Sequence, residues 1–245
     1  MIHSVRRRSG LTQRQVVFAL ALAGSALVLT SSYASRLFRS RQVAPDIAAE
    51  AQDYLRQRNV KPLDVDLDKL LVEAQRTSIP TLPHPLLNQA APDFQLSDNT
   101  GRLRTLSEHL EHGPVVVVFY YGYYCNHCVS QLFALNDDLA KFHELGAEVL
   151  AISADTPAET SEKFAKYGMF AFPVLSDPEN KVATAYSVFV PPTLTKPESL
   201  LHGTFVIDRG GVVRWCHYDR APFTANATLL VELAKTQGRL TEKSP

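Results

Sequence analysis

One stretch, residues 115–128, constrains the fold more than any other part of this chain. It reads VVVVFYYGYYCNHC and opens with a β-branched and aromatic run that has the length of one buried strand. Gly122 interrupts the run, and Cys125 and Cys128 follow it. Beyond them, residues 129–142 carry leucine and phenylalanine side chains at helical spacing. The sequence therefore predicts a buried strand, a turn that carries two cysteines, and a helix that begins at them.

The position of the two cysteines at the start of a helix favours thiol chemistry. Backbone N–H groups at a helix N-terminus have no partner within the helix, and the helix dipole is positive there. A cysteine at such a position is more readily a thiolate, which is the reactive form. With two residues between them, Cys125 and Cys128 can approach to bonding distance. One thiolate would then attack a disulfide or a peroxide, and the other thiol would resolve the product within the chain.

His127 lies between the two cysteines and has two interpretations. As an imidazolium it would stabilise a neighbouring thiolate and make the pair more oxidising; alternatively, it is a solvated surface histidine. A structural zinc site would need two further ligands, and the chain has neither a second CxxC nor a Cys–His pair to supply them. We therefore expect no metal and no cofactor at the cysteine pair.

The third cysteine, Cys216, lies in a predicted strand over residues 212–218. Strand alternation would place it on the same face as Val212 and Arg214 and opposite Val213. We expect it to be a buried or half-buried bystander thiol, because the two cysteines of the CxxC pair already have each other as nearer partners.

Basic residues are concentrated at the N-terminus. Residues 1–45 contain seven arginines and no acid, so the other 200 residues hold 18 of the 25 basic residues and all 25 acidic ones. This distribution does not fit a nucleic-acid-binding domain. Residues 15–35 are uncharged with an apolar centre, between a signal-peptide core and a spanning helix in length. We expect residues 1–44 to be an uncleaved membrane anchor, with a cleaved signal or an organellar transit peptide as alternatives.

The rest of the chain divides into a spacer and a domain. Residues 45–90 contain two segments of helical composition and then several prolines, which favours a helical, proline-rich stalk. Residues 91–240 alternate predicted strands and helices and end with a β-hairpin and a closing helix. This order predicts an α/β domain with a central sheet covered by helices on both faces.

Six motifs within residues 90–218 resemble the alkyl hydroperoxide reductase/thiol-specific antioxidant family, the peroxiredoxin-like redoxins of the thioredoxin superfamily. They are APDFQL, TLSEHL, VVVVFYYG, AISADTPAETSEKFAKYG, FPVLSDPENKVATAY and GTFVIDRGGVVRW. The resemblance implies a thioredoxin-like fold with a central mixed sheet. It also implies thiol-based reduction of peroxides or disulfides, with Cys125 and Cys128 as the catalytic pair.

This chain departs from the family pattern around the cysteines. The peroxidatic cysteine of a typical Pro-x-x-x-Thr-x-x-Cys motif falls on Cys128, and the threonine and proline fall on Cys125 and Tyr121. The supporting arginine of the family falls on His202. The cis-proline of thioredoxins falls near the same residue. His202 is thus a packing residue, a substitute for the arginine, or a metal ligand. A thioredoxin-type member would attack with Cys125 and a peroxiredoxin with Cys128, and the sequence leaves both open.

Together these observations predict a thiol-dependent oxidoreductase with antioxidant or thiol–disulfide exchange activity. Its partners would be a thiol electron donor and a disulfide or peroxide substrate. Residues 15–35 would anchor it in a membrane, with the domain outside the cytoplasm, or it would be exported and soluble. The alternative is a membrane-tethered copper-delivery module of thioredoxin fold, in which soft thiolates and His202 would bind copper. No nucleic-acid partner is expected.

Overall fold

The computed structural model describes residues 46–240. Seven strands form one sheet in the order β2-β1-β5-β4-β3-β8-β9, and two short strands, β6 and β7, pair separately. The strands are β1 (Gln95–Asp98), β2 (Leu103–Thr105), β3 (Val115–Phe119), β4 (Glu148–Ser153), β5 (Val174–Ser176), β6 (Phe189–Val190), β7 (Ser199–Leu200), β8 (His202–Ile207) and β9 (Val213–Asp219).

The sheet is mixed. Strand β3 runs parallel to β4, and β4 runs parallel to β5, whereas every other pair is antiparallel. All five residues of β3 are buried, because β4 and β8 flank it and helices cover both faces. The predicted buried strand and the predicted α/β sheet are therefore confirmed.

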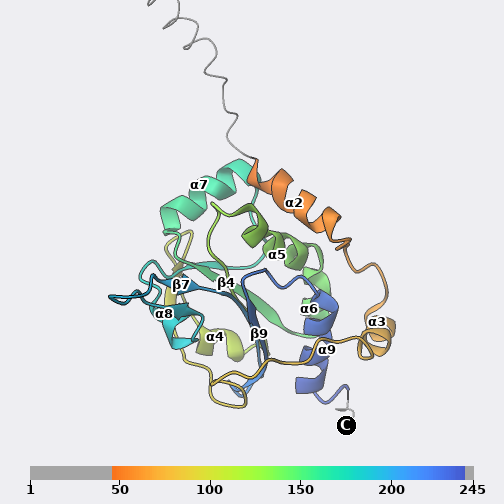
Figure 1. Cartoon of the computed structure of the whole chain (residues 1–245). Helices are drawn as coiled ribbons and strands as arrows, with labels where there is room; N and C mark the ends of the chain where they lie inside the picture. Colours follow the sequence, from red (N-terminus) through yellow and green to blue (C-terminus); the bar gives the residue numbers. More distant parts are fainter. Residues whose placement is uncertain (1–45, 241–245) are drawn as a thin grey trace, which may run out of the picture. The chain divides into compact units, whose positions relative to one another are not determined.

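Eight helices surround the sheet in the described part of the chain (Figure 1). They are α2 (Ile47–Gln57), α3 (Leu67–Ala74), α4 (Leu106–Leu110), α5 (Asn126–Asp137), α6 (Leu139–Glu144), α7 (Pro157–Tyr167), α8 (Lys181–Ala185) and α9 (Asn226–Thr236). Local sequence explains several helix starts. The Thr156 side chain caps α7 in a capping box with Glu159, and Thr105 caps α4.

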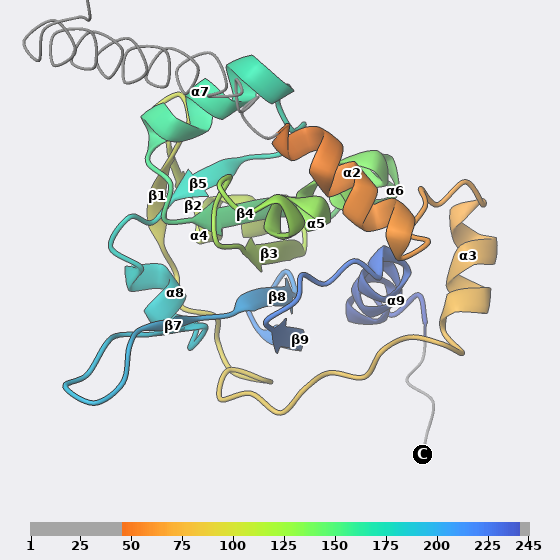
Figure 2. The same cartoon turned by 45° about the horizontal axis from the view of Figure 1, so that its top comes forward.

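Two hydrophobic clusters lie on opposite faces of the sheet. One joins Val116 and Val118 of β3 to side chains of α2, α3, α5, α6, α7 and α9. The other joins Val115 and Val117 to Leu106 of α4 and to α8. Figures 1 and 2 show the helices on both sides of the strands. This arrangement confirms the predicted helix–sheet–helix layering and fixes the C-terminal end of β3, where the cysteines follow.

The helix predicted over residues 129–142 is two helices. It breaks at Asp138, whose carboxylate accepts hydrogen bonds from the Leu63 backbone N–H at 2.7 Å and from Asn226 Nδ2 at 2.8 Å. These contacts with distant segments hold Asp138 in a non-helical conformation, with φ −100° and ψ 4°. The interruption has a tertiary cause, so the local pattern of apolar residues did not reveal it.

Residues 45–90, predicted to be a stalk, pack on the domain from residue 46 onward. The two predicted helices are present as α2 and α3, and most of their buried side chains join the same hydrophobic cluster as α5 and α9. The segment after α3 runs along β9, where the Leu82 N–H donates to the carbonyl of Cys216 at 3.0 Å. The prediction of a separate spacer is therefore wrong for the described residues, because the apolar faces of both helices have partners in the domain.

The face predicted for Cys216 is also incorrect. The pairing of β8 with β9 shifts register between Val206 and Ile207, so that Trp215 lies opposite Val206 and Val213 opposite Ile207. This irregularity at the start of β9 breaks the simple alternation on which the prediction relied. Val213 and Cys216 consequently share one hydrophobic cluster. Burial of the thiol is confirmed.

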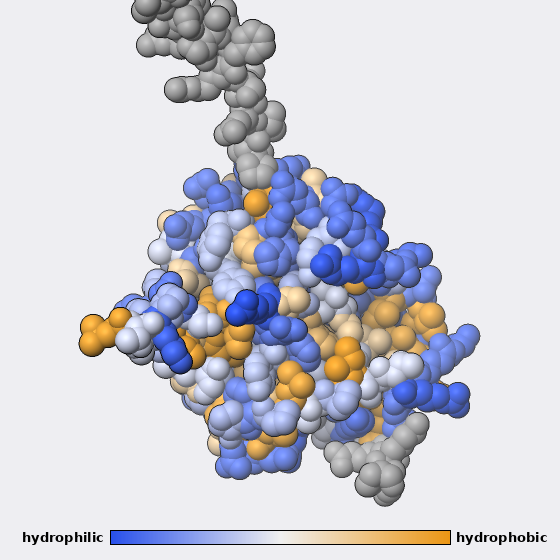
Figure 3. Space-filling model, viewed as in Figure 1, coloured by the Kyte–Doolittle hydropathy of each residue, from blue (hydrophilic) through white to orange (hydrophobic). Residues whose placement is uncertain are grey.

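Two short elements lie between β5 and β8. Helix α8 begins only after Asn180, because Asn180 has left-handed φ of 52° and the Asp177 carboxylate accepts from the N–H groups of Lys181 and Ala183. Strands β6 and β7 pair with each other and enclose a loop. The loop between them projects from the body, and Figure 3 shows hydrophobic side chains at its tip, where Leu194 is fully exposed.

The expected membrane anchor, residues 1–44, lies outside the described residues. Within residues 46–240, no helix combines the length and the hydrophobicity that crossing a bilayer requires.

Candidate active site

The turn after β3 is shaped by a close contact between Gly122 and Asp155. Gly122 has φ of 125°, a conformation that L side chains rarely adopt, and a β-carbon there would lie 2.7 Å from Asp155 Oδ1. The next residue, Tyr123, donates its backbone N–H to Asp155 Oδ2 at 2.8 Å. The chain therefore turns tightly around this carboxylate and delivers Cys125 to the start of α5.

Cys125 and Cys128 form a disulfide, with their Cα atoms 5.2 Å apart. Cys125 is the N-cap residue of α5, and Cys128 lies in its first turn. The two cysteines differ in accessibility, since Cys128 is fully buried and Cys125 is partly exposed. The structure thus brings the predicted pair together at a helix N-terminus and leaves only Cys125 open to a reaction partner.

His127 lies beside the outer cysteine. Its Nδ1 is 3.3 Å and its Nε2 is 3.5 Å from Cys125 Sγ. Its ring stacks on that of Tyr54 with centroids 5.9 Å apart, and its backbone N–H donates to Asn126 Oδ1 at 2.7 Å. The His127 ring is therefore close enough to interact with the Cys125 sulfur, and it does not point freely into solvent.

His202 begins β8 and is buried beneath the turn. The rings of His202 and Tyr121 meet edge to face, with their centroids 4.6 Å apart. The centroid of the His202 ring is 6.1 Å from that of the His127 ring. Its ring nitrogens have no hydrogen-bond partner of ordinary geometry. Burial, and then the charge of His127, lower the pKa of His202 to about 4, although nearby backbone groups of Asp219 and Arg220 act in the opposite direction. His202 is therefore a neutral aromatic packing residue near pH 7.

The donor atoms of Cys125, His127 and Cys128 lie within 4.8 Å of one another. They form the one His/Cys/Asp/Glu group in residues 46–240 with the spacing of a metal site. Both sulfurs are bonded to each other, and His202 is not in the group. The copper alternative, which required His202 as a ligand, therefore has no support in the geometry.

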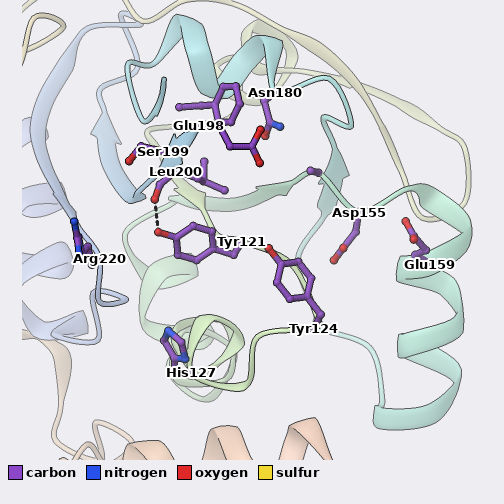
Figure 4. A pocket seen from close by; sticks show the side chains of 12 residues that line it. Tyr121, Tyr124, His127, Asp155, Glu159, Asn180, Glu198, Ser199, Leu200 and Arg220 are labelled. Carbon is purple, nitrogen blue, oxygen red and sulfur yellow. Dashed lines mark hydrogen bonds between the residues drawn. The ribbon is translucent and has the colours of Figure 1, made fainter. Parts of the chain in front are cut away.

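A cavity of about 710 Å³ opens next to the cysteine turn (Figure 4). Tyr121 and Tyr124 stand in its middle, and the Tyr121 hydroxyl donates to the carbonyl of Leu200. Its ionisable lining groups, apart from the tyrosines, are His127, Arg220, Asp155, Glu159 and Glu198. Burial, with repulsion from Glu159 as a smaller cause, raises the pKa of Asp155, while the hydrogen bond from Tyr123 opposes the shift. The aromatic run 119–124 is thus partly core and partly the wall of this cavity.

Cys216 lies away from this site. Its thiol is free and buried in the cluster on the sheet face opposite that of Cys128. Its backbone N–H donates to Thr81 Oγ1 at 2.9 Å, and burial raises the pKa of the thiol. The structure therefore excludes Cys216 as a resolving partner in this conformation.

Sequence reasoning missed three groups at the site. Asp155 lies just before α7, which Thr156 caps, and the Asp155 carboxylate holds the cysteine turn. Glu50 and Tyr54 of α2 contact residues inside the CxxC motif. The composition of residues 46–58 predicted a helix. No local signal showed against which part of the domain this helix packs.

The comparisons with known proteins agree with this geometry. The model of the AhpC/TSA family matches residues 87–216. Peroxiredoxin Q from Populus jackii is 37% identical over 126 residues, which are 51% of this chain and 57% of that protein. Alkyl hydroperoxide reductase E from Mycobacterium bovis is 35% identical over 128 residues, covering 51% of this chain and 80% of the relative.

Two further likenesses connect the chain to disulfide chemistry and to a solved structure. Thiol-disulfide oxidoreductase ResA from Geobacillus thermodenitrificans is 31% identical over 128 residues, which are 52% of this chain and 67% of ResA. The crystal structure of peroxidoxin BcpB from Mycobacterium tuberculosis superimposes with a TM-score of 0.56 at 30% identity, covering 64% of this chain and all of that one. With its family match over more than half of the sequence, this chain belongs to the AhpC/TSA family.

Proposed function

We propose that this protein is a thiol–disulfide oxidoreductase in which Cys125 attacks and Cys128 resolves. The observation that carries the proposal is the difference in accessibility within the pair. Cys128 is fully buried behind the turn, whereas Cys125 is partly exposed at the helix N-terminus. A substrate disulfide can therefore reach Cys125 first, and Cys128 can act only on an intermediate already bound to its neighbour.

The reaction follows from these positions. In the reduced protein the Cys125 thiolate attacks one sulfur of a substrate disulfide, and the other substrate sulfur leaves as a thiolate that takes up a proton. Cys128 then loses its proton and attacks Cys125 Sγ, which releases the second substrate thiol and closes the disulfide. The substrate gains two electrons and two protons, and a thiol donor returns them to the pair. His127, within 3.5 Å of Cys125 Sγ by both ring nitrogens, stabilises the attacking thiolate.

The surroundings of Cys125 support a polypeptide substrate. The adjoining cavity is open and large for a peroxide molecule, and aromatic side chains form its centre. Tyr124 is 73% exposed beside Cys125. Phe189 of β6 and Leu200 of β7 line the cavity, and Val190 and Leu194 of the same hairpin are exposed. Exposed apolar groups around a reactive centre are typical of surfaces that contact other proteins.

Peroxide reduction is the second candidate, because peroxiredoxins are among the relatives. Relative to the usual peroxiredoxin motif, Tyr121, Cys125 and His202 replace the proline, threonine and arginine. His202 has a pKa of about 4 and cannot supply the positive charge of the missing arginine at neutral pH. Arg220, which lines the cavity, is the guanidinium available for that purpose.

A direct comparison of two activities tests the assignment. We expect the reduced full-length protein to reduce insulin disulfides with dithiothreitol as donor, and to react with hydrogen peroxide no faster than an ordinary free thiol. Stopped-flow tryptophan fluorescence measures the peroxide reaction, and the turbidity of reduced insulin measures the other. Fast peroxide consumption with no insulin reduction would overturn the proposal in favour of a peroxidase.

We also propose that residues 15–35 anchor the protein in a membrane with the redox domain outside the cytoplasm. The support is the uncharged stretch itself and the arginines on both sides of it. The full chain should remain with membranes through alkaline carbonate washing, whereas a chain that begins at residue 45 should not. Recovery of the full chain in the soluble fraction would contradict the anchor.

A further inference from the structure

Helix α2 lies directly on the redox motif although it is outside the region that matches the family model. The match covers residues 87–216, and α2 spans Ile47–Gln57. Figures 1 and 2 show α2 lying across α5, the helix that starts at the cysteines. This chain therefore carries an element at the site that the shared family domain does not account for.

Two side chains of α2 contact the two residues between the cysteines. Asn126 Nδ2 donates to Glu50 Oε2 at 2.7 Å. One turn further along, the ring of Tyr54 stacks on the ring of His127, with centroids 5.9 Å apart and an interplanar angle of 29°. Because Asn126 and His127 are the variable positions of the CxxC motif, α2 contacts the part of the motif that distinguishes one redox pair from another.

These contacts are held in place by the buried face of α2. Ile47 and Ala51 are buried in the cluster that includes Cys128 and Val129 of α5, and Leu55 on the same helix is also buried. On the outer side, the guanidinium of Arg58 lies 3.5 Å from the centroid of the Tyr54 ring, which restrains that ring further. Glu50 and Tyr54 are therefore presented to the motif by a packed helix and not by a mobile segment.

We propose that α2 is a built-in part of the redox site, in which Glu50 and Tyr54 are positioning residues that set the redox potential of the Cys125–Cys128 pair. The proposal rests on the redox function proposed above. It assigns the two residues opposite effects, because one carries a negative charge and the other presents the face of an aromatic ring.

Tyr54 acts through His127. The face of an aromatic ring attracts a cation, so the stacked Tyr54 ring favours the imidazolium of His127 and keeps it next to Cys125 Sγ. A nearby imidazolium stabilises a thiolate, which exists only when the pair is reduced. Tyr54 should therefore make the pair more oxidising.

Glu50 acts in the opposite direction. Its carboxylate lies within hydrogen-bond distance of Asn126, the residue that follows Cys125. A negative charge beside the motif disfavours a second negative charge on sulfur. Glu50 should therefore favour the disulfide and make the pair less oxidising.

The equilibrium with glutathione measures both effects. Two glutathione thiols reduce the disulfide to a dithiol and become glutathione disulfide, so two electrons and two protons enter the protein; where Cys125 remains a thiolate, one of these protons is released. The fraction oxidised in a series of glutathione buffers is read by thiol alkylation and gel shift of the full-length protein. A tenfold change in this equilibrium constant corresponds to about 30 mV.

The variants separate the effect of the Glu50 charge, the effect of the Tyr54 ring and the effect of any charge on α2. Tyr54→Leu keeps apolar bulk and loses the ring, and should shift the equilibrium about two- to fivefold toward the disulfide. Tyr54→Phe should restore the wild-type value. Glu50→Gln keeps a hydrogen-bond acceptor and loses the charge, and should shift it about two- to fivefold toward the dithiol. Asp53→Asn removes the same charge from an exposed position of the same helix. It should shift the equilibrium with glutathione by less than Tyr54→Leu or Glu50→Gln does.

Two results would overturn the inference. One is that Tyr54→Leu and Glu50→Gln both retain the wild-type equilibrium constant, or both move it in the same direction. The other is that Tyr54→Leu has the same effect in a His127→Ala background as in the wild type, because the proposed effect passes through His127. If the wild-type pair itself fails to equilibrate with glutathione, the proposed function is wrong, and that outcome is distinct from a wild-type equilibrium that the α2 variants leave unchanged.

Discussion

The carboxylate of Asp155 occupies the space into which a side chain on Gly122 would project. A β-carbon on Gly122 would lie 2.7 Å from Oδ1 and 3.0 Å from Oδ2 of Asp155. The same carboxylate accepts the N–H of Tyr123, two residues before Cys125. The glycine and the aspartate therefore determine together where the chain turns and where the reactive cysteine is placed.

This relationship predicts a large effect of Gly122→Ala. The substitution would force an L side chain into φ of 125° and against the carboxylate, and should lower the free energy of unfolding by roughly 2–4 kcal/mol. Gly101→Ala is the matched control, since Gly101 also has positive φ, 83°, but no heavy atom within 4 Å of the added carbon. It should cost only about 1 kcal/mol. Urea unfolding compares them, and equal losses would show that the contact with Asp155 is unimportant.

Asp155→Asn should make the protein more stable at pH 7. Burial raises the pKa of Asp155 above its ordinary value, so the folded state holds this proton more tightly than the unfolded state does. The resulting stabilisation is complete below the ordinary pKa and is lost as the pH rises through the folded-state pKa. At pH 7 the wild-type Asp155 is ionised in a buried position, which destabilises the folded state. Asparagine is neutral, and its side-chain oxygen can still accept the hydrogen bond from the Tyr123 N–H.

Thermal melts over a pH series check this prediction. The melting temperature of Asp155→Asn should exceed that of the wild type at pH 7, and the difference should narrow toward pH 4. Asp155→Ala removes the acceptor as well as the charge, and should be less stable than Asp155→Asn by about 1–3 kcal/mol. A melting temperature of Asp155→Asn below the wild-type value at pH 7 would mean that the charged form of the carboxylate stabilises the turn.

The two cysteines should behave differently when each is replaced. Cys128→Ser leaves the partly exposed Cys125 without a resolving thiol and should accumulate a mixed disulfide with a substrate or with glutathione. Cys125→Ser leaves only the buried Cys128 and should accumulate none. Intact-mass spectrometry after incubation with glutathione disulfide detects the adduct, and an adduct on Cys125→Ser alone would reverse the assigned roles.

Cys216 should be inert in the folded protein. Burial raises the pKa of its thiol, and Thr81 and Leu82 surround it with hydrogen-bond contacts. We expect iodoacetamide to label Cys125 of the reduced protein within minutes and Cys216 only after urea is added. Peptide mass spectrometry assigns the label. Equal labelling of the two residues without urea would show that the segment around Cys216 opens readily.

The centre of this fold could be predicted from sequence because its signals are local. Four valines followed by two aromatic residues indicate a buried strand, and a glycine followed by CxxC and helically spaced leucines indicates a turn and a helix. The capping box of α7 and the Gly210-Gly211 hairpin are equally local. In each case the residues that decide the structure are within a few positions of one another.

The errors arose where distant residues decide the outcome. Asp138 ends α5 because Leu63 and Asn226 donate to its carboxylate, and neither is near it in sequence. Likewise, the apolar face of α2 was evident, but not that it packs on α5 and brings Tyr54 against His127. The sequence therefore predicted the part of the site that lies within the CxxC motif. It did not reveal the part that α2 contributes through tertiary packing.

His202 offers a further test, because it stands where the family has a charged residue and is itself neutral. It is 2% exposed, and burial is the main cause of its low pKa of about 4. An unfolded histidine has a pKa near 6.5. Since the folded state takes up this proton less readily than the unfolded state, His202 contributes stability that is present above about pH 6.5 and is lost as the pH falls through about 4.

We therefore expect the wild type to lose stability between pH 6.5 and pH 4 relative to His202→Phe, by roughly 3 kcal/mol at the lower end of this range. Phenylalanine retains an aromatic ring against Tyr121 and cannot be protonated. Urea unfolding of both proteins at several pH values isolates the contribution, because every other titrating group is common to the two and cancels. A constant difference across this range would mean that the folded and unfolded states take up the His202 proton equally readily, so that burial does not lower the pKa of His202.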